Sequence, residues 1–324
     1  MAKPLVLVTR RIPEPALAYL ARRCRVRLHA PDRPMTRAEL RSQIRDVDGL
    51  LCTPVDRIDR WILRAAPRLR GIANCAVGVD NLDLEEARRL GLPVSNTPGV
   101  LSAATADLTW ALILAVLRRV VEGDRLIRAG GFPGWSPTFH LGHSLQGKTL
   151  GILGMGRIGR EVARRATAFS MQTIYWSRTR LPGRVGASGP RYRPLRRLLA
   201  ASDVLTIHLP GGPSTRGLLG ARELALLKPG AVLINTARGE IVVESALVAA
   251  LRSGKLFGAG LDVYPHEPRV PRPLLAMPNV VLLPHIGSAT VETRQAMAMM
   301  AAVNLVDMLD GRKPPNPVRL SPRR

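Results

Sequence analysis

Short apolar segments alternate with helical patterns over residues 1–98 of the chain. A short, uninterrupted apolar run predicts a strand that is buried on both faces, as strands of parallel sheets are. Alternation of such strands with helices is typical of a doubly wound α/β domain. The predicted strands are Leu5–Val8, Val26–His29, Leu50–Cys52, Ile72–Ala76 and Pro93–Ser95, and the predicted helices are Pro13–Arg23, Arg37–Arg45, Arg60–Ala66 and Leu84–Leu90.

A second series of the same kind follows a break at Thr97-Pro98-Gly99, which suits a hinge. The segment Leu101–Val120 is apolar nearly all round and predicts a helix buried between domains or subunits. A second hinge, Ile286-Gly287-Ser288, precedes a last helix, Ala289–Leu309. Between the hinges the predicted strands are Thr149–Leu153, Gln172–Trp176, Val204–His208, Ala231–Asn235, Gly260–Val263 and Val280–Leu283, with helices such as Val243–Ser253 between them.

These patterns predict an α/β protein with two doubly wound, Rossmann-like domains, each built on a parallel sheet and separated by a cleft. Residues 1–98 with 289–324 are assigned to one domain, and residues 99–288 to the other. The first has no glycine pattern for phosphate binding. We therefore expect it to carry the substrate.

A glycine fingerprint lies between the strand Thr149–Leu153 and a helix predicted from Glu161 onward. Its first glycine suits a tight turn, its second lets backbone N–H groups approach a pyrophosphate, and its third lets the helix pack close to the strand. The N-terminus of the helix then faces the phosphate charge. The fingerprint predicts dinucleotide binding through Gly154, Met155, Gly156, Arg157, Ile158 and Gly159.

The formal net charge of +24 would ordinarily favour a nucleic-acid partner. However, Lys supplies only 5 of the 48 basic residues, and the arginines are scattered through the chain instead of forming a run with interleaved aromatics. We therefore expect no nucleic-acid partner. A positive field that attracts small anions is compatible with this charge.

The three cysteines, Cys24, Cys52 and Cys75, are widely spaced and each lies in or beside an apolar run. An odd number of cysteines without a CxxC pattern predicts buried thiols in a reduced protein, and hence a cytoplasmic one. No set of His, Cys and acidic residues has metal-ligand spacing. The most apolar long segment, Val100–Val121, contains three charged residues, so we expect no membrane span.

Three side chains suited to acid–base and carboxylate chemistry follow predicted strands of the second series. They are Arg238 after AVLIN, Glu267 after AGLDV and His285 after VVLLP. The carboxyl ends of parallel strands form the edge where ligands bind. An arginine can bind a carboxylate bidentately, and a histidine beside a carboxylate can exchange a proton near neutral pH. Together with the fingerprint, these residues predict a hydride-transfer site.

The sequence resembles the D-isomer-specific 2-hydroxyacid dehydrogenase family over nearly its whole length. The matching stretches are NCAVGVDNLDL, NTPGVLSAATADL, KTLGILGMGRIGREVA, LKPGAVLINTARGEIV, GAGLDVYPHEP and LPHIGSAT. Within the family it looks most like the glyoxylate/hydroxypyruvate reductases, through GWSPTFHLGHSLQGKTLGI, YWSRTR and HIGSATVETRQAMA.

The resemblance implies a role for each candidate residue. Arg238 would anchor and polarise a 2-oxoacid, His285 would pass a proton to its carbonyl oxygen, and Glu267 would hold and tune His285. The turn containing Val77 and Gly78 in a flavodoxin-like substrate domain would offer N–H groups to the substrate carboxylate. Asp262 would lie beside the nicotinamide amide, and His208, Thr236 and Ala237 are also assigned to the cofactor site.

One departure from NAD-selective members concerns the end of the second strand of the cofactor domain. Those members place an acidic residue there, whereas this chain has Ser177, Arg178, Thr179 and Arg180. Without a carboxylate to repel a 2′-phosphate, and with two guanidiniums to pair with it, we expect NADPH to be preferred and NADH to be possible. The alternative is that both arginines are simply exposed loop residues. A second departure, Gly211-Gly212, puts cofactor affinity in doubt.

The leading hypothesis is reduction of glyoxylate or hydroxypyruvate to the D-2-hydroxy acid by a homodimer. Other members of the family remain alternatives, namely a broad 2-ketoacid reductase, D-3-phosphoglycerate dehydrogenase or phosphite dehydrogenase. A dinucleotide-sensing binding protein is an alternative of another class. Phe139 falls where related reductases place a large apolar residue, which either packs in the interface or reaches the partner's active site.

Overall fold

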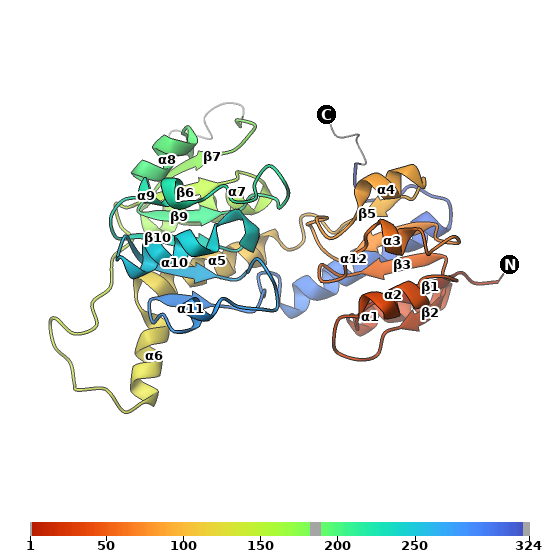
Figure 1. Cartoon of the computed structure of the whole chain (residues 1–324), viewed down its shortest axis with the longest axis horizontal. Coiled ribbons are helices and arrows are strands. Elements are labelled where there is room, and N and C mark those ends of the chain that lie inside the picture. The colour runs from red at the N-terminus through yellow and green to blue at the C-terminus, as the bar shows by residue number, and fades with distance from the viewer. Residues whose placement is uncertain (1, 182–188, 320–324) are drawn as a thin grey trace. The chain divides into compact units, whose positions relative to one another are not determined.

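The computed structural model describes residues 2–181 and 189–319, which form two compact units (Figure 1). The first unit comprises Met1–Leu101 and Ala289–Arg324, and the second comprises Ser102–Ser288. Each is an α/β structure built on a parallel sheet, so the predicted fold class is confirmed. The cleft stays a prediction.

The sheet of the first unit has the strand order β2-β1-β3-β4-β5, and all its neighbours pair in parallel. Its apolar strands were predicted to within one or two residues at each end. The strands are β1 (Leu5–Val8), β2 (Arg25–Leu28), β3 (Gly49–Cys52), β4 (Gly71–Asn74) and β5 (Val94–Ser95).

Helices cover both faces of this sheet. One face packs against α2 (Arg37–Gln43), α3 (Arg60–Leu63) and α4 (Leu84–Arg89), which share a core with Leu7, Leu50 and Ile72. On the other face α12 (Val291–Leu309) lies against β3, β4 and α1 (Glu14–Arg23). The unit is therefore doubly wound, and its last helix comes from the C-terminal part of the chain.

The sheet of the second unit has the order β12-β11-β10-β9-β6-β7-β8, again with parallel neighbours. The chain runs outward from β6 through β7 and β8, and then returns to β9 on the other side of β6. This reversal next to β6 is a topological switch point, where ligands bind in such sheets. The strands are β6 (Thr149–Leu153), β7 (Gln172–Trp176), β8 (Arg191–Tyr192), β9 (Val204–Ile207), β10 (Ala231–Asn235), β11 (Leu256–Leu261) and β12 (Val280–Leu282).

Two apolar cores lie on the two faces of this sheet. One is shared with α8 (Leu195–Ala201), α9 (Ala221–Ala225), α10 (Glu244–Arg252) and α11 (Arg272–Leu275). The other contains α5 (Ser102–Leu117) and α7 (Arg157–Ala166). Two short 3-10 helices occur in this unit, Thr167–Phe169 after α7 and Gly239–Ile241 after β10.

The apolar helix α5 is buried along the side that faces its own sheet. Trp110, Ile113 and Val116 pack in the core of the second unit, where sheet residues such as Ile152 and Ile234 surround them. Its own sheet and α7 cover part of the helix, whereas Ala103, Asp107 and Ala111 are exposed along another side. Burial of that side between domains or subunits stays a prediction.

The helix predicted to reach Val120 ends at Leu117, and a second helix, α6 (Val120–Arg128), follows. Arg119 separates the two with a φ of 53°, a left-handed conformation that interrupts a helix. The α6 helix has no buried residues. Figure 1 shows it, with the segment that follows, extending away from the sheet of its unit.

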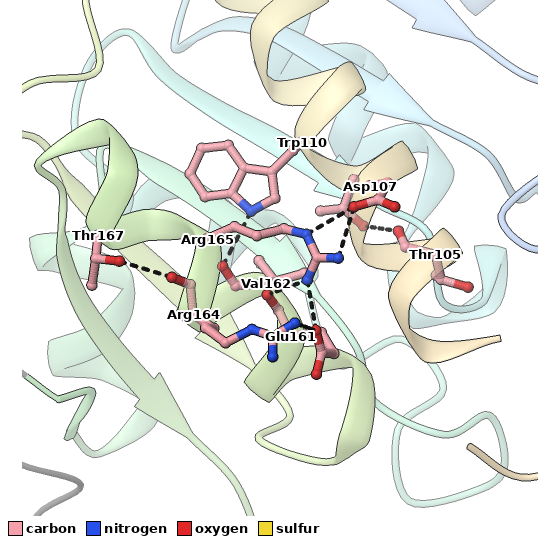
Figure 2. Close-up of polar contacts among 9 residues, drawn as sticks. Thr105, Asp107, Trp110, Glu161, Val162, Arg164, Arg165 and Thr167 are labelled. Carbon is pink, nitrogen blue, oxygen red and sulfur yellow. Dashed lines mark hydrogen bonds and ion pairs between the residues drawn. The ribbon is translucent and has the colours of Figure 1, made fainter. Parts of the chain in front are cut away.

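Side-chain contacts fix α7 against α5 (Figure 2). The Trp110 indole N–H donates to the carbonyl oxygen of Val162 at 3.1 Å. Arg165 lies 2.8 Å from a carboxylate oxygen of Asp107 on α5 and 2.7 Å from one of Glu161 on its own helix. These contacts hold the helix that begins at the glycine fingerprint.

All three cysteines are buried free thiols, which confirms their predicted place in the core. None of the helices in residues 2–181 and 189–319 combines the length and apolar character that a membrane span requires. Within the same ranges, no group of three or more His, Cys, Asp or Glu side chains is arranged to hold a metal ion.

Candidate active site

The three fingerprint glycines meet three different surroundings. Gly154 has a φ of 99°, and a Cβ there would lie 2.5 Å from the carbonyl oxygen of His208. A Cβ at Gly159 would lie 2.1 Å from the carbonyl oxygen of Gly154, so α7 packs directly on the turn. A Cβ at Gly156 would meet no protein atom within 4 Å. The second glycine therefore borders open space, whereas the other two border protein.

The N-terminus of α7 opens at this turn. Gly156 is the N-cap residue and provides no side-chain hydrogen bond to the first turn. The first N–H groups of a helix have no partner within the helix and carry partial positive charge, so an anion binds well there. Around this N-terminus Met155 is buried, Ile158 is half-buried and Arg157 is exposed.

The residues that follow β7 are exposed or half-buried at the same edge of the sheet. The Ser177 hydroxyl donates to the carbonyl oxygen of Thr179, which closes a tight turn. The side chains of Arg178 and Arg180 are exposed, and the Arg180 guanidinium lies 4.2 Å from the centre of the Tyr192 ring. The two predicted cations are thus at the carboxyl end of β7, which neighbours β6.

Glu267 and His285 form a hydrogen-bonded pair beyond the ends of the neighbouring strands β11 and β12. The distance from His285 Nδ1 to Glu267 Oε2 is 2.8 Å, and Glu267 Oε1 accepts a hydrogen bond from the Tyr264 N–H at 3.0 Å. Because a carboxylate can only accept, Nδ1 carries the proton and Nε2 is the outward nitrogen of the ring.

Several groups determine how readily Glu267 ionises. Burial acts to raise the pKa of its carboxyl. The hydrogen bond and charge of His285, the N–H of Tyr264 and the charge of Arg238 outweigh burial and lower that pKa below its ordinary value. Glu267 is therefore a carboxylate at neutral pH.

Asp262 fixes the backbone around His285 through two hydrogen bonds. His285 has a φ of 56°, which is uncommon for a residue with a side chain. The next two N–H groups, of Ile286 and Gly287, donate to Asp262 at 2.7 and 2.8 Å. Burial raises the pKa of this carboxyl, although the two N–H groups act in the opposite direction. Such conformations persist where surrounding contacts fix them, and they concentrate at functional sites.

Arg238 lies in the turn after β10, next to β11 in the sheet. Asn235 fixes this turn because its amide donates to the carbonyl oxygen of Arg238 at 2.9 Å and accepts from the Ala237 N–H at 3.0 Å. The hydroxyl of Thr236 lies 3.0 Å from that of Thr109. The three predicted catalytic residues therefore follow three adjacent strands, and Glu267 directly contacts His285.

His208 follows β9, and its surroundings differ from those of His285. Its Nε2 lies 2.8 Å from the Thr206 hydroxyl, and its Nδ1 is buried without a partner in the described part of the chain. Burial lowers the pKa of His208 to about 3. This histidine is therefore neutral and is not suited to proton exchange.

The Gly211-Gly212 loop contacts the segment that carries Arg238. A Cβ at Gly211 would lie 3.1 Å from Arg238 Cγ and 3.2 Å from a carboxylate oxygen of Glu240. Glu240 in turn accepts hydrogen bonds from the Gly212 N–H at 2.9 Å and from Arg216 at 2.8 Å. This departure from the family pattern thus adjoins a predicted catalytic residue.

In the first unit, the turn after β4 is held by two asparagines. Asn96 donates to the carbonyl oxygen of Val77 and Asn74 to that of Gly78, both at 2.8 Å. The N–H groups of Val77 and Gly78 have no acceptor among residues 2–181 and 189–319. They are thus free to bind an anion.

Residues 110–287 match the family model described as D-isomer specific 2-hydroxyacid dehydrogenase, NAD binding domain. The chain belongs to this family. It is 46% identical over 318 residues to a glyoxylate reductase of Thermococcus litoralis (97% of this chain, 96% of the relative) and 51% identical over 321 residues to one of Aeropyrum pernix (98% and 96%).

Solved structures of the family share the fold. A glyoxylate reductase from Paecilomyes thermophila has a TM-score of 0.88 and 36% identity, with 98% of this chain and 99% of that chain covered. An NADPH-dependent glyoxylate/hydroxypyruvate reductase from Sinorhizobium meliloti, in complex with NADP and malonate, has a TM-score of 0.87 and 36% identity, with 100% and 99% covered.

As a member of this family, the protein is an NAD(P)-dependent oxidoreductase that acts on CH–OH groups, and a nicotinamide dinucleotide is its cofactor. The residues present fit this cofactor. The open space at Gly156 and the uncapped N-terminus of α7 suit a pyrophosphate.

The prediction from sequence did not include several residues that position the site. Asn235 and Tyr264 act through hydrogen bonds of a backbone turn, and Glu240 acts on a neighbouring loop. Their proximity to Arg238 and Glu267 along the chain was the only signal available.

Proposed function

We propose that this dehydrogenase reduces glyoxylate or hydroxypyruvate to the D-2-hydroxy acid. The main support is the Glu267–His285 pair at 2.8 Å, next to the strand that leads to Arg238. The pair occurs in a chain 46% and 51% identical, over nearly the full length, to proteins described as glyoxylate reductases.

In the proposed reaction, the nicotinamide dinucleotide supplies the hydride that reaches the carbonyl carbon of the substrate. His285 donates the proton from Nε2 to the carbonyl oxygen, so that the 2-oxo group becomes a 2-hydroxy group. The Glu267 carboxylate holds Nδ1–H and stabilises the protonated ring before transfer. Its lowered pKa keeps it charged for this purpose.

We assign substrate binding to cationic and N–H groups. The Arg238 guanidinium can bind the substrate carboxylate and point a donor at the carbonyl oxygen. The free N–H groups of Val77 and Gly78 suit the same carboxylate. We assign cofactor binding to the fingerprint residues and to Thr236, Ala237, Asp262 and His208, all of which lie at or beside the carboxyl ends of strands in the second sheet.

The reaction is tested by following the absorbance of the reduced nicotinamide with a panel of 2-oxoacids, 3-phosphoglycerate and phosphite. We expect the highest kcat/KM with glyoxylate or hydroxypyruvate. Another preferred substrate would indicate a different member of the family. A flat trace across the panel with tight cofactor binding would indicate a sensor.

The catalytic roles are tested with Arg238→Ala and His285→Asn. Each should lower kcat/KM by about 10²–10⁴-fold, because each removes a group that acts in the transition state. The controls are Arg272→Ala and His266→Asn, which alter exposed residues of the same types. Near-normal turnover of Arg238→Ala with an intact fold would remove the assignment.

We further propose that NADPH is preferred over NADH. The exposed guanidiniums of Arg178 and Arg180 suit a 2′-phosphate, and no acidic residue occupies the segment 177–180. Kinetics with both cofactors should give a kcat/KM at least about tenfold higher for NADPH. A tenfold preference for NADH would overturn this proposal.

We also propose that the enzyme is a homodimer formed by residues 120–141. This segment carries five exposed apolar side chains and extends away from its sheet (Figure 1). Exposed apolar side chains concentrated in one segment are typical of an interaction site, and a second copy of the chain offers the same segment. Phe139 is half-buried against Phe132 and His140 within it. The exposed residues are Val120, Ile127, Phe132, Trp135 and Leu141.

Light scattering during size-exclusion chromatography tests the dimer. The wild type should have twice the mass of one chain. Trp135→Ser combined with Ile127→Ser should shift the protein toward the monomer, whereas Leu275→Ser, an equally exposed apolar residue on α11, should not. A monomeric wild type would rule out the interface.

The three buried thiols suit a reducing compartment, and we propose the cytoplasm.

A further inference from the structure

The edge of the second sheet next to the proposed 2′-phosphate site is completed by the two-residue strand β8. Tyr192 pairs in parallel with Tyr175 of β7, and the Arg193 N–H donates to the carbonyl oxygen of Tyr175 at 2.8 Å. Because the strands are parallel, the residues after β8 lie at the same edge as Ser177 and Arg178. The strand β8 is therefore a neighbour of the segment that follows β7.

Two tyrosines hold that segment. The hydroxyl of Tyr175 accepts a hydrogen bond from the Leu181 N–H at 3.0 Å, which fixes the end of the segment. The rings of Tyr175 and Tyr192 meet edge to face, with centres 5.6 Å apart at an angle of 76°. The face of Tyr192 then carries the Arg180 guanidinium at 4.2 Å. Contact with a ring face leaves the N–H donors of a guanidinium available to a further partner.

The charge around Arg180 favours an anion. Residues 162–202 contain no Asp or Glu. Among the described residues of this stretch, six exposed arginines come after β7. None of the six has an ion pair with an acidic residue in the described part of the chain. They are Arg178, Arg180, Arg191, Arg193, Arg196 and Arg197. Arg180 is thus held in place by a neutral ring and not by a carboxylate that would compete with a phosphate.

We propose that Tyr192 is a positioning residue that sets cofactor preference, because its ring places the Arg180 guanidinium for the 2′-phosphate of NADPH. This inference rests on the proposed preference for NADPH. It assigns part of that preference to β8, a strand outside both the glycine fingerprint and the segment 177–180. Arg180 without the ring would keep its charge but lose its fixed orientation, so the 2′-phosphate would be bound less well.

The test compares Tyr192→Leu with Tyr192→Phe. The leucine variant removes the aromatic face, and the ratio of kcat/KM for NADPH to that for NADH should fall about fivefold, mainly through KM for NADPH. The phenylalanine variant keeps the face and should keep the ratio. Binding of 2′,5′-ADP measured by calorimetry should weaken in the leucine variant by about the same factor, whereas binding of 5′-AMP, which lacks the 2′-phosphate, should weaken much less.

A matched control exists in the first unit, where Arg23 lies 4.1 Å from the centre of the Tyr19 ring. Tyr19→Leu removes the same kind of contact away from the second unit and should leave the cofactor ratio unchanged. A double-mutant cycle with Arg180→Gln adds a second measurement. Once Arg180 is absent, Tyr192→Leu should have no further effect on the ratio.

The outcomes separate the inference from the proposed function. A wild type without preference for NADPH overturns the preference itself. A wild type that prefers NADPH, with an unchanged ratio in Tyr192→Leu, overturns only the role of Tyr192. Equal losses with both cofactors, or a further fall of the ratio in the Arg180→Gln background, would make Tyr192 a structural residue and also overturn it.

Discussion

His208 and His285 both follow strands of the second sheet, but their surroundings differ. The Nδ1 of His285 is hydrogen-bonded to the Glu267 carboxylate, whereas the Nδ1 of His208 is buried without a partner in the described part of the chain, and burial lowers the pKa of His208. The same side chain is therefore suited to proton transfer in one place and kept neutral in the other. A residue's surroundings, more than its type, decide which histidine can act as the acid.

The enclosure of His208 predicts a dependence of stability on pH. Its pKa falls from 6.5 to about 3 on folding, so between these values the unfolded chain binds a proton that the folded chain does not. The free energy of unfolding should therefore decrease as the pH is lowered from about 6.5 toward 3, with no further decrease from this group below that range. Urea unfolding at a series of pH values measures this slope.

His208→Gln should flatten that slope, since glutamine does not titrate. His266→Gln is the control, because His266 is exposed. If wild type and His208→Gln lose stability in parallel on acidification, His208 is protonated in the folded protein and the expectation is wrong.

The strand β6, the glycine turn and α7 form one element. The effects of two of its glycines, on stability and on cofactor affinity, can be distinguished by experiment. Gly159→Ala places a Cβ 2.1 Å from a backbone oxygen and should lower the free energy of unfolding by about 1–3 kcal/mol. Gly156→Ala places its Cβ in open space, so stability should change little while cofactor affinity falls.

Denaturant unfolding and NADPH titration by fluorescence distinguish the two effects. A stable Gly159→Ala protein would mean that α7 can shift away from the turn. Undiminished cofactor affinity in Gly156→Ala would mean that the pyrophosphate does not approach this residue.

Long apolar strands were the most predictable elements. The bounds of β6 and β10 are those expected from their sequences, because a buried parallel strand is mostly apolar. The strand β11 begins at Leu256, earlier than predicted, because Gly258 interrupts the apolar pattern. The two-residue strand β8 exists through its pairing with β7, which no local pattern indicates.

The sequence predicted which residues belong to the site but not which of them contact each other. The residues Arg238, Glu267 and His285 stood out because each follows an apolar strand. That Glu267 reaches His285 depends on β11 lying beside β12, a result of sheet order. The support from Asn235 and Asp262 likewise depends on how the chain turns after a strand.

The whole molecule carries a formal charge of +24, and its proposed substrates and cofactor are anions. A positive field speeds the encounter with an anion, and salt screens it. Raising the NaCl concentration from about 0.02 to 0.3 M should therefore lower kcat/KM for the 2-oxoacid, with a smaller change in kcat. A kcat/KM independent of salt would show that the scattered arginines do not act on the approach of the substrate.

The position of α12 has a consequence for the order of folding during synthesis. The second unit is one continuous stretch, Ser102–Ser288, and can fold once that stretch has left the ribosome. The first sheet is made earlier, but the part of one face formed by β3 and β4 stays uncovered until Val291–Leu309 has been synthesised. Domains generally fold as units during translation, N-terminal ones first. Here the unit that begins the chain completes its core last, so its exposed apolar face is the surface that chaperones would meet.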